Sequence, residues 1–415
     1  MSGRWTPPRN ESMIDSATAV SLVVQHSRPG PSRRVPLFQA LGRTQAADVT
    51  CDIDYPPFDR AMMDGFAVRA QDVTEPGTRL RLLGSVAAGS AATRPLGRGE
   101  SYRINTGAPV PTGATAVVPV EMADVAPGGE MVTLSIATVA GLHVASRSSC
   151  ARAGSVVLAA GLRIEAAEIA TAAAAGATQV TVYADPTVGI LATGDELVPI
   201  DQRPATAQIR NSNSSMLHAL VARAGGEAVD LGIAPDQSDA LGVAIGRGLR
   251  CDLLCITGGV SMGEHDLVPG CLSRLGCTTH FRRVAIKPGK PTLLATSARG
   301  GLVFGLPGNP ISAMVSFLLF VEPALRIRQG RGPHGPRLIN AIVEAAMPGV
   351  GDRESYWPVR MEPDDDGHLR AKPLSWRGSG DPFGVAGANA LLVRPRRDGP
   401  LKPGDAVKVL PLHEC

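Results

Sequence analysis

The spacing of apolar positions changes several times along the chain, and each change predicts a different kind of structure. Residues 12–28 show the period of an amphipathic helix, which Ser12 can cap and Pro29 and Gly30 can end. The residues expected to face inward along this helix are Ile14, Ala17, Val20 and Val24. The next stretch, RVPLFQALGRTQAADV over residues 34–49, is predicted to form a second helix.

The pattern of apolar and polar residues changes at residue 51. Between residues 51 and 145, short apolar runs such as RLRLLGSVAA and MVTLSIAT alternate with glycine and proline, which predicts an all-β module. Helical spacing returns in the alanine-rich run 166–175, which Gly176 stops. We expect this helix to pack on the N-terminal helices. The β domain over 51–145 is then an insertion in a discontinuous helical domain formed by 1–50 and 146–184.

The second half of the chain alternates strands and helices. Between residues 185 and 330, the runs TVGILAT, EAVDLGIA, CDLLCIT and GLVFGL read as strands, and SSMLHALVARAGG and SDALGVAIGRGL as helices. This alternation predicts an open, mainly parallel sheet with helices on both faces. Residues 331–415 return to short strands and turns, as in NALLVRPR and GDAVKVLPL, which predicts a small C-terminal β-barrel. The fold class is therefore multidomain, α/β plus β.

Length and composition restrict the class of protein. A chain of 415 residues exceeds what one hydrophobic core usually holds, in agreement with several domains. The net charge is only +3 and no long basic block occurs, so nucleic acid is not an expected partner. The start of the chain has no apolar segment typical of a signal peptide, and the run AMVSFLLFV is short for a membrane span. Seven cysteines lie mostly in apolar runs, which favours core thiols and a cytoplasmic location.

Three polar loops follow predicted parallel strands: ATGDEL at 192–197, TGGVSMGEHD at 257–266 and GLPGNP at 305–310. The carboxyl ends of parallel strands meet at one edge of a sheet, so these loops should border one crevice. Glycines let backbone N–H groups approach a ligand, and helix N-termini favour anions. Carboxylates beside a phosphate usually hold a divalent cation between them. The crevice is therefore predicted to bind a phosphate-bearing small molecule and Mg²⁺, although each loop alone could be a plain strand-to-helix turn.

Two further stretches carry charged residues within otherwise apolar segments. In FDRAMMDGFAV, Asp64 is either part of a hairpin turn with Gly65 or a member of a site. In VAIKPGKP, Lys287 and Lys290 form either a solvated turn or a clamp for an anion. The chain contains no G-x-x-x-x-G-K-[ST] motif and no G-x-G-x-x-G after a strand, so a P-loop or a dinucleotide site is not predicted.

Taken together, these stretches resemble one family. MMDGFAVR, RINTGAPVPTGATAVVPVE, LATGDELV, QIRNSN, TGGVSMGEHD, VAIKPGKP and GLPGNPISA are similar, in this order, to motifs of the molybdopterin molybdenumtransferases, the MoeA proteins and the E-domain of gephyrin. The resemblance implies a MogA-like α/β domain and a homodimer, with the α/β domain of one subunit facing the β domain of the other. It also implies the reaction. The family binds adenylylated molybdopterin and molybdate, cleaves the adenylyl group with a divalent cation, and places molybdenum on the dithiolene sulfurs with release of AMP.

The resemblance also assigns roles to residues. Asp64, Glu196 and Asp266 match the catalytic acids, of which Glu196 and Asp266 are expected to hold Mg²⁺. The residues expected to bind molybdate are Lys287, Lys290, Arg353 and Ser379. The residues expected to bind the adenylylated pterin are Thr106, Thr193, Gly194, Asp195, Asn211, Asp236, Gly258, Gly259, Ser261, Pro307, Gly308 and Asn309. Among the acids, we expect Glu196 to lie deeper in the crevice than Asp195.

The chain departs from the family pattern at the run HVASRSSC. Ser149 and Cys150 stand where the family has an acidic pair, and Ala145 stands at a usual basic position. In the C-terminal domain, Pro358 replaces a second arginine that usually follows Arg353. These departures suggest an alternative, a paralogue that binds molybdopterin or its adenylate as a carrier or scaffold with little turnover.

Two more classes of protein share part of this organisation. A MogA-like adenylyltransferase would share only the α/β domain, and a gephyrin-like scaffold would need a peptide groove that the sequence does not mark. Contact with the molybdopterin adenylyltransferase is a further expectation. The sequence leaves molybdate and tungstate open, because the two oxyanions have nearly the same size and charge.

Overall fold

The computed structural model describes residues 13–260, 267–332 and 335–412, and the chain divides into two compact units. The α/β–barrel unit combines Met1–Arg33 with Val182–Cys415. The inserted unit is Arg34–Thr181, which the chain enters through β1 (Ser32–Pro36) and leaves through β12 (Gln179–Tyr183). Each unit is described by itself.

An open sheet forms the centre of the α/β–barrel unit. Its strands are, in spatial order, β16 (Glu227–Ala234), β13 (Thr187–Thr193), β17 (Leu253–Thr257), β21 (Leu302–Leu306), β20 (Leu293–Thr296) and β18 (Thr278–Phe281). The first four are parallel, and β20 and β18 are antiparallel. Every residue of β17 is buried, as expected for a parallel strand covered on both faces. The prediction of an open, mainly parallel sheet is confirmed.

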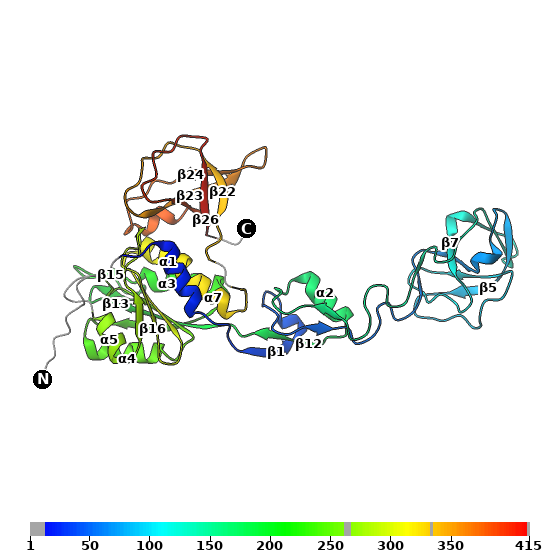
Figure 1. Ribbon diagram of the computed structural model, residues 1–415, viewed down its shortest axis with the longest axis horizontal. Helices are drawn as coiled ribbons and strands as arrows, with labels where there is room; N and C mark the ends of the chain where they lie inside the picture. The colour runs from blue at the N-terminus through cyan, green and yellow to red at the C-terminus, as the bar shows by residue number, and fades with distance from the viewer. Residues whose placement is uncertain (1–12, 261–266, 333–334, 413–415) are drawn as a thin grey trace. The chain divides into compact units, whose positions relative to one another are not determined.

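Helices cover both faces of this sheet (Figure 1). One face carries α1 (Ser16–His26), α3 (Ser212–Arg223), α6 (Pro310–Ser316) and α7 (Glu322–Arg328), and the other carries α4 (Ser238–Gly248) and α5 (Val268–Arg274). A π-helical segment, Phe317–Val321, joins α6 to α7 without a break. By length and composition the continuous helix Pro310–Arg328 could cross a membrane, but 83% of its apolar window is buried inside the protein. This helix is longer than the apolar run suggests, and it belongs to the core.

Helix α1 differs from its sequence-based prediction in both its start and its buried face. Asp15 is the N-cap, and its carboxylate accepts a hydrogen bond from the Thr18 N–H at 2.7 Å. Ser12, the predicted cap, lies outside the described residues. The buried residues are Ala19 and Val23, whereas Ala17 is exposed. The helix packs against α7 and the π-helical segment. The alanine-rich helix belongs to the other unit, so the predicted packing between the two helices stays a prediction.

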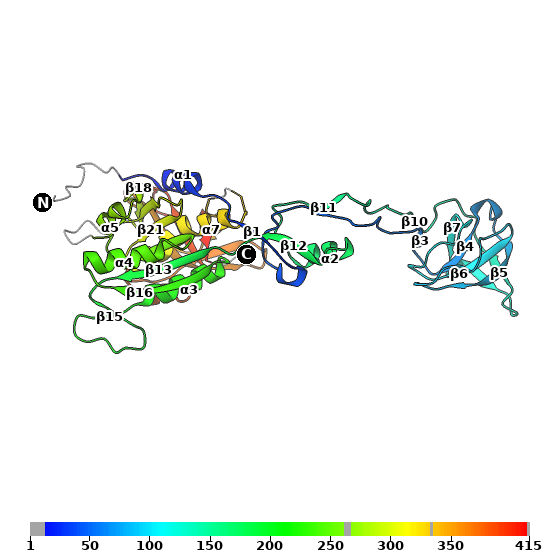
Figure 2. The same cartoon turned by 90° about the horizontal axis from the view of Figure 1, so that it is seen from below.

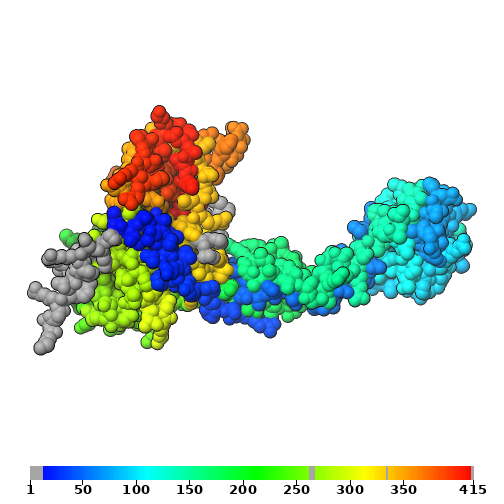
Figure 3. Space-filling view, viewed as in Figure 1, coloured from blue at the N-terminus to red at the C-terminus, as the bar shows by residue number. Residues whose placement is uncertain are grey.

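The C-terminal β-barrel is confirmed. Its strands are β22 (Ile339–Val343), β23 (Glu354–Pro363), β24 (Leu369–Pro373), β25 (Ala390–Arg394) and β26 (Ala406–Pro411), with a 3₁₀ turn at Pro382–Val385. The order β23-β24-β22-β26-β25 closes because β25 also pairs with β23. Tyr356, Leu391 and Leu410 of the barrel share one buried cluster with Phe317 and Phe320 of the long helix. In Figure 3 the orange and red atoms of the barrel accordingly lie against the yellow atoms of that helix.

The inserted unit contains the predicted all-β module. Its main sheet has the order β7 (Ala116–Pro119), β4 (Gly65–Val68), β6 (Glu100–Ile104), β5 (Thr78–Val86), β9 (Met131–Leu134) and β8 (Ala123–Val125). Figure 2 shows β7, β4, β6 and β5 side by side. The smaller elements around it are β3 (Arg60–Ala61) paired with β10 (Val144–Ala145), and 3₁₀ turns at Ala70–Asp72 and Val120–Met122.

The rest of the inserted unit is less helical than predicted. Residues 34–49 form the end of β1 and a 3₁₀ turn at Leu37–Gln39, so the prediction of a second helix is wrong. Proline at position 36 interrupts the run near its start, and a glycine with φ of +76° at position 42 interrupts it in the middle. The strands β2 (Val49–Thr50) and β11 (Val156–Leu158) pair beside the alanine-rich helix, α2 (Ala166–Ala174). The finer domain boundaries remain a prediction.

Candidate active site

The loops that follow β13, β17 and β21 meet at the carboxyl ends of their strands. The N–H of Gly258 donates to the carbonyl oxygen of Leu306 at 3.2 Å. A Cβ atom on Gly258 would overlap the carbonyl oxygen of Thr193, and one on Gly308 would lie 3.9 Å from Gly258 Cα. The backbone of the middle loop therefore runs directly between the other two. This geometry confirms the expectation that the three loops lie together at one edge of the sheet. Glycine is required at position 258 because the backbone of Thr193 approaches so closely.

A fourth loop joins them from the end of β16. The hydroxyl of Thr193 donates to Oδ1 of Asp236 at 2.6 Å, and the N–H of Asp236 donates to Oδ1 of Asp195 at 3.1 Å. Thr193, Asp195 and Asp236, which all belong to the predicted site, are thus linked by hydrogen bonds. Asp195 and Glu196 are both exposed, so Glu196 does not lie deeper in the crevice as expected.

The start of α3 borders the same loops. Asn211 is buried and caps the helix, accepting from the Ser214 N–H at 3.1 Å and donating to the Ser214 hydroxyl at 2.8 Å. The amide of Asn213 donates to the Gly308 carbonyl at 2.7 Å, a contact that sequence reasoning missed. The open pocket beside these residues is lined by Gly194, Asp195, Leu197, Asn211, His218 and Asp230, among others. Of these lining residues, Leu197 belongs to the short strand β14 (Leu197–Val198), which pairs in parallel with β15 (Ile209–Arg210).

The expected metal ligands are only partly described. Asp266 and Ser261 lie outside the described residues, as does the neighbouring His265. The carboxylate of Glu196 is exposed and makes no hydrogen bond or ion pair within the described ranges. A free carboxylate with hard oxygen donors fits Mg²⁺.

Asp64 and Thr106 form a second group, within the inserted unit. Oδ1 of Asp64 accepts from the Thr106 N–H at 2.6 Å and from the Thr106 hydroxyl at 2.9 Å. These two donors, the N–H first, lower the pKa of Asp64 from its ordinary value. The hairpin-turn alternative is wrong, because Gly65 begins β4, which pairs with β6 and β7 and not with β3. Pairing of Gly65 with Ile104 places Asp64 beside Thr106.

The four residues expected to bind molybdate line one pocket in the α/β–barrel unit. Lys287, Lys290, Arg353 and Ser379 are joined there by Pro307 and Asn309. The pocket forms because the short strand β19 (Ile286–Lys287) pairs with β23 of the barrel, with Lys287 opposite Ser355. Arg353 Nη1 donates to the Ile286 carbonyl at 3.4 Å. Three cationic side chains and a hydroxyl around one hollow suit a compact oxyanion. Both lysines are exposed, and the choice between a clamp and a solvated turn stays a prediction.

Two tryptophans complete the wall of this oxyanion pocket, and sequence reasoning missed them. Trp357 and Trp376 both line the pocket, and their ring centroids lie 5.5 Å apart with an interplanar angle of 80°. Neither falls in a motif, so only the rarity of tryptophan, three in the whole chain, could have drawn attention to them.

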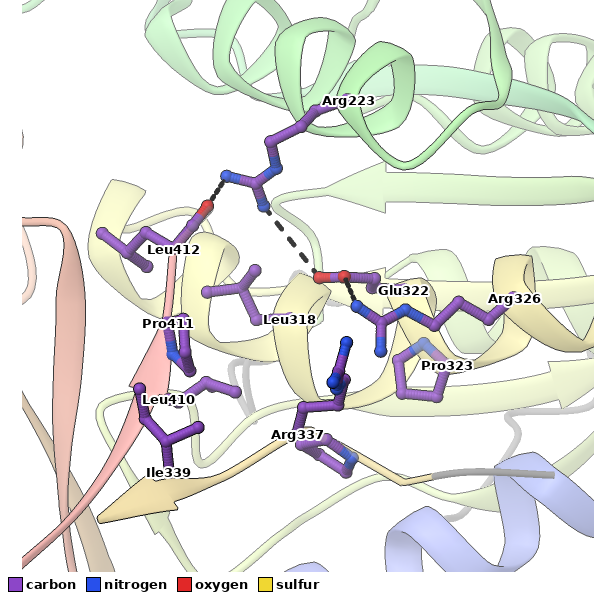
Figure 4. Close-up of a pocket in the computed structure, with 11 residues that line it drawn as sticks. Arg223, Leu318, Glu322, Pro323, Arg326, Arg337, Ile339, Leu410, Pro411 and Leu412 are labelled. Atoms are coloured by element: carbon purple, nitrogen blue, oxygen red, sulfur yellow. Dashed lines mark hydrogen bonds and ion pairs between the residues drawn. The ribbon is translucent and has the colours of Figure 1, made fainter. Parts of the chain in front are cut away.

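A separate cavity lies where α3 and α7 meet β26 (Figure 4). Glu322 accepts from Arg326 at 2.7 Å and lies 4.0 Å from Arg223, which also donates to the carbonyl of Leu412. Arg337 also lines the cavity, and Glu322 is the one acid among the described residues that line it, where it neutralises part of the arginine charge. We interpret this arginine–glutamate cluster as a structural link between the helices and the barrel.

A turn of the barrel brings together Asp364, Asp366 and His368, whose ligand atoms lie within 4.8 Å of one another. Asp364 already accepts from the N–H groups of Asp366 and His368 and from Arg370 at 2.6 Å. These bonds are those of a tight turn with a paired carboxylate, and they explain the cluster without a metal.

The departures from the family pattern lie at exposed or apolar positions. Ser149 and Cys150 are exposed, in a turn where the Cys150 N–H donates to the Tyr55 carbonyl at 3.0 Å. Pro358 is buried in β23 opposite Leu391. The residue before Pro358 in the same strand, Trp357, lines the oxyanion pocket. The missing arginine is therefore missing from a strand that borders this pocket.

Comparison with protein-family models finds three matches in chain order. Residues 14–176 match the MoeA N-terminal region (domain I and II), residues 189–327 a probable molybdopterin binding domain, and residues 340–412 the MoeA C-terminal region (domain IV).

Individual relatives match over nearly the full chain. A molybdopterin molybdenumtransferase of Bacillus subtilis (strain 168) is 33% identical over 404 residues, covering 95% of this chain and 93% of that protein. One from Nostoc sp. (strain PCC 7120) is 34% identical over 410 residues, covering 97% and 94%. The crystal structure of the molybdopterin biosynthesis moeA protein from Pyrococcus horikoshii OT3 is similar with a TM-score of 0.83 and 27% identity, covering 96% of this chain and 100% of that one.

Proposed function

This chain belongs to the MoeA family of molybdopterin molybdenumtransferases, and on that premise we propose which of its residues carry out molybdenum insertion. The protein is a transferase of molybdenum cofactor biosynthesis whose activity is the insertion of molybdenum. Its substrates are proposed to be adenylylated molybdopterin and molybdate, and its products the molybdenum cofactor and AMP. Hydrolysis of the phosphoanhydride consumes one water and releases AMP. The two dithiolene sulfurs replace oxygen on molybdenum, and the displaced oxygen leaves as water.

The observation that carries this proposal is the oxyanion pocket. Lys287 and Lys290 come from one turn of the α/β domain, while Arg353 and Ser379 come from two segments of the barrel. These cations come from separate segments, and no carboxylate stands among the described residues that line the pocket, so their positive charge is not neutralised there. Molybdate is a tetrahedral dianion, so the lysines supply point charges and the arginine supplies directed donors.

The adenylyl end of the substrate is proposed to lie on the strand-end loops. The glycines of these loops let a phosphate approach the backbone, and the carboxylate of Glu196 makes no hydrogen bond within the described residues. With Asp266, Glu196 would hold Mg²⁺, which would supply neutralisation of the phosphate charge. Asp64, kept ionised by Thr106, is the proposed third acid.

We infer a homodimer from the division of these acids. Asp64 belongs to the inserted unit and Glu196 to the α/β–barrel unit, and in the family the two are expected to meet across subunits. Sedimentation should therefore give about twice the mass of 43.0 kDa. A stable monomer with full activity would contradict the shared site.

The reaction itself is tested with purified protein, adenylylated molybdopterin, molybdate and Mg²⁺, following AMP release and cofactor formation. Lys287→Gln should raise the KM for molybdate about tenfold, because a charge-assisted contact is lost. Lys372→Gln is the matched control, since Lys372 is an exposed barrel lysine outside the pocket. Equal effects of the two substitutions would contradict the assignment of the pocket.

The alternative of a carrier with little turnover finds no support in the relatives, which are named as transferases. We propose a cytoplasmic location, which the thiols support: the described cysteines at positions 51, 150, 251, 255, 271 and 277 are all free. Contact with the molybdopterin adenylyltransferase is also proposed, because direct transfer would protect the reactive adenylate from water. Copurification of the two proteins would test it.

A further inference from the structure

Two tryptophans stand at the oxyanion pocket in a chain that is poor in aromatics. Aromatic residues make up 4% of the sequence, and the chain has three tryptophans. Trp357 and Trp376 line the pocket together with Lys287, Lys290 and Arg353. Large apolar rings beside three cations are unexpected if the pocket needs only charge, so the rings call for their own explanation.

The two rings are held in place from both sides. The indole N–H of Trp357 donates to the Leu374 carbonyl at 3.1 Å, and its ring packs against the buried cluster of the barrel. Trp376 packs against the core cluster that the barrel shares with the α/β domain. The edge-to-face contact at 5.5 Å and 80° then fixes one ring against the other.

The rings also separate two hollows. Trp357, Trp376 and Lys287 line the oxyanion pocket, and the same three residues line a second pocket with Tyr356 and Arg394. The pair therefore lies between the two hollows. In this arrangement the indole of Trp376 makes no hydrogen bond within the described residues, so it presents an apolar face and an available N–H.

We propose that Trp376, braced by Trp357, is a positioning and specificity-determining residue for the oxyanion; this rests on the proposed function of the pocket. Lys287 and Lys290 are both exposed, so water would weaken their attraction for an anion. An apolar wall removes water from one side of the bound ion and strengthens each charge interaction. Sulfate is the smaller dianion and holds its water more tightly than molybdate, so contact with an apolar wall favours molybdate over sulfate.

The test compares Trp376→Ala and Trp376→Phe in the full-length protein. Binding of molybdate alone and of sulfate alone is measured by calorimetry, and the KM values for molybdate and for the adenylylated pterin are measured in turnover. We expect Trp376→Ala to weaken molybdate binding about tenfold and sulfate binding much less, so discrimination between the two falls. Trp376→Phe should keep most of the discrimination because it keeps an aromatic wall.

A second measurement uses the tryptophans themselves. In a Trp5→Phe background, Trp357 and Trp376 are the remaining tryptophans, and molybdate should change their fluorescence. Phe383→Ala is the control, because Phe383 is 85% exposed on the turn that follows Trp376 and lies outside the pocket. It should leave all readouts unchanged.

The outcomes separate the two proposals. If the natural protein binds molybdate but Trp376→Ala keeps the same affinity and the same preference over sulfate, the wall has no role and the inference is wrong. A rise in the KM for the pterin alone would also contradict it. If the natural protein shows no molybdate binding and no molybdate-dependent turnover, the pocket itself is wrongly assigned. Trp376→Leu serves if the alanine variant does not fold, with an intermediate loss of discrimination expected.

Discussion

The side-chain amide of Asn309 donates a hydrogen bond of 2.9 Å to the hydroxyl of Ser379. The N–H of Ile311 donates to the carbonyl of the same serine at 3.2 Å. These bonds tie a strand-end loop of the α/β domain to the barrel segment that borders the oxyanion pocket. The position of Ser379 is therefore set by the loop proposed to bind the other substrate, which gives the two substrate sites a direct physical link.

A double-mutant cycle tests this link. Asn309→Ala and Ser379→Ala should each weaken molybdate binding, and the double variant should lose less than their sum. We expect a coupling of about 0.5–1 kcal/mol, typical of one exposed hydrogen bond. Asn340→Ala, an exposed asparagine on the barrel strand β22, is the control. Strict additivity of the two losses would mean that Asn309 does not position Ser379.

Thr106 should determine the acid limb of the pH–rate profile. Thr106→Val removes the hydroxyl donor but keeps the backbone N–H, so the pKa of Asp64 should rise part of the way to its ordinary value. As pH falls, the variant should lose activity at a higher pH than the natural protein. Thr106→Ser, which restores the hydroxyl, should restore the profile. Identical acid limbs for all three proteins would remove Asp64 from the chemistry.

Alanine substitutions at Gly258 and Gly300 separate two costs: the strain of a left-handed backbone and the steric overlap of an added Cβ atom. Both glycines have positive φ, +87° and +81°, but only Gly258 has a neighbour in the path of a Cβ atom, the carbonyl oxygen of Thr193. Gly300→Ala should cost about 1 kcal/mol of unfolding free energy for its left-handed backbone. Gly258→Ala should cost about 2 kcal/mol more, because the loops must move apart. Denaturant unfolding measures both, and equal costs would contradict the close approach of the loops.

Because His26 stacks on His280, we expect the packing of α1 against the rest of its unit to weaken at low pH. Their rings stack with centroids 3.7 Å apart, and burial first, then the neighbouring His26, lowers the pKa of His280 from its ordinary 6.5. His280 therefore binds a proton more readily in the unfolded chain than in the folded one. The stability that the neutral His280 side chain contributes is present above pH 6.5 and is lost as the pH falls below it.

His26→Gln should raise the pKa of His280, read by NMR titration, and flatten this pH dependence. His368→Gln, at an exposed turn of the barrel, should leave it unchanged. If the His26 variant keeps the steep dependence, the stacked pair does not cause it.

The missing acidic pair at positions 149 and 150 can be restored without burying charge. Ser149 and Cys150 are exposed, so Ser149→Glu with Cys150→Asp should fold normally. If acids at these two positions take part in the reaction directly, the double variant should insert molybdenum several times faster at low molybdate. This change in rate corresponds to about 1 kcal/mol in the activation free energy. An unchanged or lower rate, with equal folding and pterin affinity, would show that this departure does not limit activity.

The order of elements in the α/β domain follows from local sequence alone. Apolar runs such as LLCIT at β17 are buried on both faces, and the helices between them carry one apolar side, so the periods of the two element types are distinct. The connection rules of parallel sheets then place the three strand-end loops together. The prediction for residues 34–49 is wrong because their apolar spacing resembles a helix while a proline and a glycine govern the backbone.

What the sequence determined by itself, then, is the kind of each domain, the strand-end crevice and, through its motifs, the candidate residues. Only the tertiary structure decided which of them share a pocket. Lys287 meets Arg353 because β19 pairs with a barrel strand, and Asp64 meets Thr106 because β4 pairs with β6. Pairing between distant strands depends on the whole packed core and not on local propensity. For the same reason no pattern along the chain could place Trp376 beside the lysines.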